Sequence, residues 1–196
     1  MMHHAPRTTV WVVHDNKQVR EPMMRLLSFG WGLGGVVLLL GYAIVRLLPL
    51  VTEALDDSLT WPQWAVFGGN TLLMAYYEGY RGFQKGFSPR VAARAKYLYN
   101  HPQVWPALLA PLFCLGYFQT TRQRKIITYA LTVMIVGFIL IIHQLPQPWR
   151  GLVDAGVVVG LSWGVLSLLY YGVQAFTSAV FDYSPEVDDE SFVRAS

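Results

Sequence analysis

The stretch that decides the fold is LLSFGWGLGGVVLLLGYAIV, residues 26–45, where twenty consecutive residues include no Asp, Glu, Lys, Arg or His. An α-helix rises 1.5 Å per residue, so a stretch of this length crosses a hydrocarbon core of roughly 30 Å. Similar apolar segments follow along the chain. The sequence therefore predicts an all-α, polytopic transmembrane helix bundle with five apolar segments, at about 26–50, 62–82, 103–119, 126–143 and 151–177.

The composition agrees with a membrane domain. Of the 196 residues, 54% are hydrophobic and 14% charged, which is too apolar for an ordinary soluble domain. We expect one helix bundle over 26–180, with an N-terminal tail at 1–25 and an acidic C-terminal tail at 181–196. The net charge of +3 comes from basic residues that flank the apolar segments, which indicates membrane orientation rather than nucleic-acid binding. Cys114, the single cysteine, excludes an intrachain disulfide.

Charged loops give the expected orientation. Four basic residues, Arg7, Lys17, Arg20 and Arg25, precede the first segment. The loop at 52–61 carries only acidic charges, and the connection at 81–103 carries five Lys or Arg residues. Since cytoplasmic loops are enriched in Lys and Arg, we expect an integral protein of the plasma or inner membrane with its N-terminus in the cytoplasm.

The third segment allows two topologies. It has enough uncharged length to span, but Pro106 and Pro111 interrupt it. The distribution of Lys and Arg favours a re-entrant segment, and therefore four spans. We nevertheless favour five spans, because non-helical backbone at membrane depth needs cover from protein or water.

The second segment carries a carboxylate within the expected hydrocarbon slab. Helical periodicity places Asn70, Glu78 and Arg81 within one broad stripe. An unpaired carboxylate at this depth is costly. Glu78 therefore either forms a structural ion pair with Arg81, reaches the headgroups, or serves as a protonatable group in a cavity.

After this segment, Ser88 followed by Pro89 is typical of a helix start. The helix that follows carries Arg90, Arg94 and Lys96, and we expect it to lie on the cytoplasmic face with these cations toward anionic headgroups. An ordinary solvated connecting helix is the alternative. The bilayer and other membrane subunits are the expected partners.

Glycines recur four residues apart in two segments. Gly30 and Gly34 lie in the first, and Gly156, Gly160 and Gly164 in the fifth. Such spacing makes a shallow groove that lets helices approach closely, either within the chain or across a dimer.

A haem or metal site would depend on where the histidines lie. Bis-histidine haem ligation would require His101 and His143, which five spans bring to one side and four spans separate. No metal-binding motif is present, so we expect no metal. The candidate functional cluster is Asn70, Glu78, Arg81, His101, His143 and Asp154.

Three function classes follow from these features. The favoured one is a non-enzymatic accessory, assembly or complex subunit, because catalytic motifs are scarce. The alternatives are an enzyme or electron carrier acting on a lipid-soluble substrate or haem, and a small proton-coupled transporter that uses Glu78.

Overall fold

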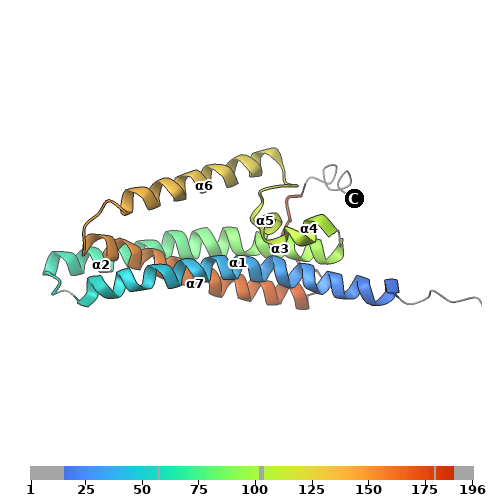
Figure 1. Ribbon diagram of the computed structural model, residues 1–196, viewed down its shortest axis with the longest axis horizontal. Helices are drawn as coiled ribbons and strands as arrows, with labels where there is room; N and C mark the ends of the chain where they lie inside the picture. Colours follow the sequence, from blue (N-terminus) through green and yellow to red (C-terminus); the bar gives the residue numbers. More distant parts are fainter. Residues whose placement is uncertain (1–15, 57, 102–103, 179, 188–196) are drawn as a thin grey trace, which may run out of the picture.

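A computed structural model describes residues 16–56, 58–101, 104–178 and 180–187. Helices account for nearly all of these residues, and the described part contains no strand. Figure 1 shows a long bundle with one helix set apart from it. The helices are α1 Asn16–Asp56, α2 Trp61–Met74, η1 Ala75–Phe87, α3 Ser88–Asn100, α4 Val104–Leu108, α5 Ala110–Leu115, α6 Arg122–Ile142 and α7 Trp149–Thr177.

Three helices are long and apolar enough to cross a membrane: Pro22–Asp56 within α1, and the whole of α6 and α7. Their length and apolar composition fit a membrane protein. A fourth long helix is made of three parts, because α2, η1 and α3 follow one another without a break. η1 is a π-helix of 13 residues, in which hydrogen bonds join residues five apart.

The structure does not confirm five spanning segments. The third expected segment, 103–119, contains two short helices, α4 with five residues and α5 with six. At 1.5 Å per residue, six residues rise only about 9 Å. Leu109 leaves the helical conformation between them, and Gly116 ends α5 with a φ of 86°. Pro106 and Pro111 remove two backbone donors, which explains why this apolar stretch does not continue as one helix.

The direction of the chain follows from this interruption. α1 runs from one end of the bundle to the other, and α2, η1 and α3 return (Figure 1). α4 and α5 stay at the end where α3 finishes, and α6 and α7 make a second pair of opposite passes. The described parts of the chain therefore begin and end at the same end of the bundle.

α5 packs against α1 through small residues. A methyl group added at Gly32 would lie 2.9 Å from the Cys114 sulfur, and one at Gly35 would overlap the Pro111 ring. Trp31 Nε1 also donates to the Leu108 carbonyl at 3.2 Å. The glycines singled out in the sequence, Gly30 and Gly34, lie elsewhere on α1, with nothing described within 4 Å of an added methyl group. Within the described part of the chain they make no close helix contact.

The continuous helix of α2, η1 and α3 packs against α7 along a groove lined by glycines. A methyl group at Gly156 would overlap the Asn70 amide, and one at Gly164 would lie 2.7 Å from the Phe83 ring. Near the far end of the groove, the Ser88 and Ser167 hydroxyls are 2.7 Å apart. Close approach of this kind is what small residues at fourfold spacing allow.

The π-helix sets the register along this groove. The side chains that enter it from α2 are spaced by four residues, and those from η1 onward by five. Five is the hydrogen-bonding interval of a π-helix, so residues spaced by five lie close to one face. In chain order, the side chains that enter the groove are Asn70, Met74, Glu78, Phe83 and Ser88.

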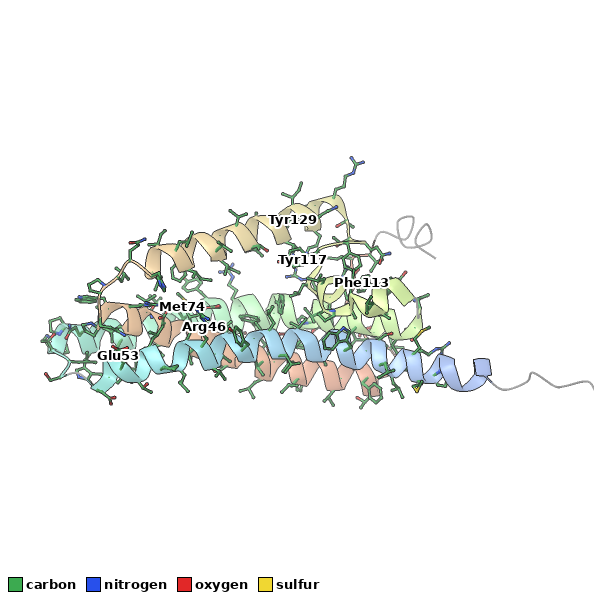
Figure 2. All side chains as sticks on the ribbon, in the orientation of Figure 1. Arg46, Glu53, Met74, Phe113, Tyr117 and Tyr129 are labelled. Carbon is green, nitrogen blue, oxygen red and sulfur yellow. The ribbon has the colours of Figure 1, made fainter. Side chains whose placement is uncertain are left out.

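α6 lies apart from the bundle (Figure 1). Its contacts are concentrated near its beginning, where the Tyr117 hydroxyl lies 2.8 Å from Thr132 Oγ1 and the Tyr117 ring meets the Tyr129 ring edge to face. Figure 2 shows both tyrosines at this junction. Along the rest of the helix the apolar side chains are exposed, with Val133 at 72% and Ile141 at 66%.

Candidate functional site

Glu78 lies near the middle of the α7 helix. A methyl group added at Gly160 would be 2.8 Å from Glu78 Oε2, so the carboxylate rests directly on the backbone of α7. Gly160 is about 16 Å from the Trp149 end of α7 and about 25 Å from the Thr177 end, at 1.5 Å per residue. If α7 spans the membrane, this carboxylate is far from both surfaces.

The ion pair expected between Glu78 and Arg81 does not form. Arg81 is exposed, and no hydrogen bond or ion pair joins Glu78 to another described residue. Both residues lie in η1, whose wider turn keeps residues four or five apart on one face and turns residue i+3 away from it. The helical offset that predicts the pair therefore does not apply here, and Glu78 faces α7 while Arg81 lies on the exposed surface.

Three of the predicted residues gather at the end of the bundle where α7 begins. Arg150 connects His143 to Asp154: its Nη2 donates to His143 Nδ1 at 2.9 Å, and its Nε lies 3.9 Å from Asp154 Oδ2. Nearby, Asn70 Nδ2 donates to the Leu152 carbonyl at 3.0 Å. Asp154 is only 5% exposed, and its Oδ2 accepts no hydrogen bond in the described part of the chain.

His101 lies at the opposite end of the molecule. It follows the last turn of α3, with its ring stacked on Tyr97 at 4.5 Å and its Nδ1 3.2 Å from the Tyr97 carbonyl oxygen. His143 follows α6 at the other end (Figure 1). The two histidines therefore cannot ligate one haem together. Among the described residues, no group of three His, Cys, Asp or Glu side chains is placed to hold a metal ion.

Arg94 is buried inside the bundle, although the sequence predicted it at the membrane surface. The residue is 3% exposed, and its guanidinium lies 4.2 Å over the Phe113 ring. It donates four hydrogen bonds to backbone carbonyls, those of Phe113, Phe118, Gln119 and Pro185. Burial lowers the pKa of Arg94 to about 10, which leaves the guanidinium charged at neutral pH.

α3 thus packs into the bundle, and Arg94 does not face outward as the sequence predicted. Val91, Ala92, Ala95 and Leu98 are buried together with Arg94, and Ser88 continues the helix instead of capping it. The alanines between the two arginines are the available sequence signal for burial. Lys96 also turns inward: its Nζ donates to the carbonyl of Ser178.

The C-terminal segment 180–187 meets α3 and α6 beside Arg94. Arg124 Nε lies 3.5 Å from Glu186 Oε2, and Thr120 Oγ1 donates to the Glu186 carbonyl at 2.9 Å. Arg90 extends toward the same place, where a small pocket is lined by Arg90, Arg94, Arg124 and Glu186. The acidic tail was expected at 181–196; its residues 188–196 lie outside the described part of the chain.

Comparison of this chain with protein-family models, curated proteins and solved structures finds no match.

Proposed function

We propose that this protein is a four-span integral membrane protein that acts as a non-enzymatic accessory or assembly subunit, with both termini in the cytoplasm of a cell whose plasma or inner membrane holds it. The spans are α1, α2 with η1, α6 and α7. In this topology, thirteen of the fifteen Lys and Arg residues lie in the cytoplasm or in the cytoplasmic half of a span, and only Arg46 and Arg150 lie toward the outside. The positive-inside rule supports that arrangement.

The observation that carries the proposal is the isolation of α6. The other three spans pack on one another, whereas α6 has the length and composition of a span but presents apolar side chains nearly all round. Lipid can solvate such a helix, and a second helix can equally pack on it. We propose that the transmembrane helix of another membrane polypeptide packs on α6, held by van der Waals contact.

A photo-crosslinking amino acid at Val133 of α6 tests this proposal, with Leu72 of α2 as the matched control. Both side chains are exposed, at 72% and 74%. In cells, we expect a protein adduct of one defined size from Val133 and only lipid adducts from Leu72. Lipid adducts from both positions would rule out a helix partner at this part of α6. Co-expression of two differently tagged copies would identify an adduct with a second copy of this chain.

A second candidate, a proton-coupled transporter, is favoured by one observation. Glu78 places a carboxyl group near the middle of α7 with no described cation to pair with it, and intramembrane carboxylates of this kind commonly relay protons. The test is proton flux into vesicles that contain the purified protein. Loss of flux in Glu78→Gln but not in Glu53→Gln, an exposed control, would support transport. Absence of flux in the wild type would remove this candidate.

The enzyme or electron-carrier alternative finds no support in the geometry, because His101 and His143 lie at opposite ends of the molecule.

A further inference from the structure

Three arginines from two separate helices surround one pocket. Arg90 and Arg94 come from α3, and Arg124 comes from the first turn of α6. Phe87, Val91 and Leu115 supply apolar walls, which keep water away from part of the site. Of the described residues that line the pocket, one is acidic: Glu186, which comes from the C-terminal segment.

The charges of the described side chains in this pocket do not balance. Among them, three guanidinium groups face one carboxylate, and burial together with the Arg124 charge lowers the pKa of Arg90. The 3.5 Å contact between Arg124 and Glu186 is partly exposed, so it contributes little stability. A second anion would relieve the repulsion among the arginines.

The three arginines also differ in how they are used. Arg94 is already committed to hydrogen bonds within the protein, because its nitrogens donate to four carbonyl oxygens. Arg90 is not: its Nε is buried and has no hydrogen-bond partner in the described structure. A buried donor without a partner has lost its hydrogen bonds to water and gained none in return, at a higher cost when it is charged, so this group favours binding an acceptor.

The free space in the pocket is about 10 Å³, which is room for no more than one water. We propose that a phosphoryl group binds here by displacing the Glu186 carboxylate, and that Arg90 and Arg124 are its ligands. Guanidinium groups recognise phosphate oxygens through paired hydrogen bonds, and two arginines from different helices can bind one phosphate from two sides. Arg94 is a positioning residue, because it fixes the loop after α5 and the C-terminal segment through their carbonyls.

The position of the pocket fits a phosphate at the membrane surface. Arg124 lies two residues before Ile126, where the apolar stretch of α6 begins. This places the pocket at headgroup level in the four-span topology, on the side that carries most of the basic residues. The phosphoryl group can therefore belong to a lipid headgroup or to free phosphate. This assignment of depth depends on the proposed spans, whereas the arginine pocket itself does not.

The test uses the full-length protein, purified in detergent and stripped of lipid. Binding is measured by native mass spectrometry with phosphatidylglycerol and with phosphatidylcholine, and by thermal shift with inorganic phosphate against chloride at equal ionic strength. The variants are Arg90→Gln, Arg124→Gln and Glu186→Gln. The controls are Arg122→Gln and Lys125→Gln, exposed cations beside the pocket that do not line it.

We expect Arg90→Gln and Arg124→Gln to weaken binding at least tenfold, the two controls to change it less than twofold, and Glu186→Gln to strengthen it several-fold. Binding of phosphatidylglycerol without a response to inorganic phosphate would identify a headgroup site. Competition of inorganic phosphate with the lipid would identify a free-phosphate site. Equal losses in pocket and control variants would show only general attraction to anions and overturn the proposal. So would weaker binding in Glu186→Gln, or no phosphate binding by the wild type. Melting curves of each variant exclude unfolding as the cause of a loss.

Discussion

Gly164 has no room for a side chain, because three atoms of the Phe83 ring lie within 2.9 Å of the position of an added methyl group. An aromatic ring cannot bend away, so Gly164→Ala must separate η1 from α7. We expect a loss of about 1–3 kcal/mol in the free energy of unfolding, typical of overpacking. Denaturant titration in mixed micelles measures it. Gly137→Ala on α6 is the control, since nothing lies within 4 Å there, and an equal loss in both variants would contradict the groove.

The hydrogen bonds of Arg94 should keep the Cys114 thiol inaccessible to reagents. The thiol is 2% exposed, and burial raises its pKa to about 12, so the folded protein should resist maleimide at pH 7. Arg94→Gln leaves buried carbonyls without donors and should loosen the packing around α5. We expect labelling of Cys114 to become at least tenfold faster. Arg122→Gln, an exposed cation, should label as slowly as the wild type; fast labelling of the wild type would show that α5 is not packed as described.

At the residue scale, the sequence predicted positions on regular helices better than positions at tertiary junctions. The glycine spacing in the fifth segment was visible because it follows one helix face, and Gly156, Gly160 and Gly164 all receive side chains. On α1 the same spacing pointed to Gly30, whereas Gly32 makes the contact. Which glycine is used depends on where α5 lies, and no local pattern contains that information.

The hydrogen bond between Ser88 and Ser167 depends on the register that η1 sets between α3 and α7. The two hydroxyls are buried and 2.7 Å apart, and Ser167 also donates to the Gly164 carbonyl at 3.0 Å. A double-mutant cycle with Ser88→Ala and Ser167→Ala should give a coupling energy of about 0.5–1.5 kcal/mol, the usual net worth of one such bond. Thermal or denaturant unfolding of the four proteins supplies the numbers. A coupling energy near zero would mean that α3 and α7 do not hold this register.

At the element scale, the helices that the sequence misjudged are those whose surroundings come from elsewhere in the chain. α3 carries several cations and was assigned to the membrane surface, but the carbonyls that accept from Arg94 belong to α5, the loop after it and residue 185. η1 broke the expected pairing of Glu78 with Arg81 because its π hydrogen bonding changes which residues share a face. Neither effect is local to the helix concerned.

At the scale of the whole molecule, two principles predicted different topologies. The rarity of re-entrant segments favoured five spans, while the positions of the Lys and Arg residues favoured four. The two short helices α4 and α5 agree with the charges. With an even number of passes, His101 and His143 separate, and the cluster predicted from the sequence divides between the two ends of the bundle.

The location of the C-terminus tests this topology directly. Four spans place residue 196 on the same side as residue 1, whereas five place it opposite. We expect a fluorescent reporter that folds only in the cytoplasm to be active when fused after Ser196, and inactive when inserted in the acidic loop between α1 and α2. An enzyme active only outside the membrane should give the reverse pattern. External activity after Ser196 would require the 103–119 segment to cross, which would separate Arg124 from Arg90 and so contradict the pocket that both residues line.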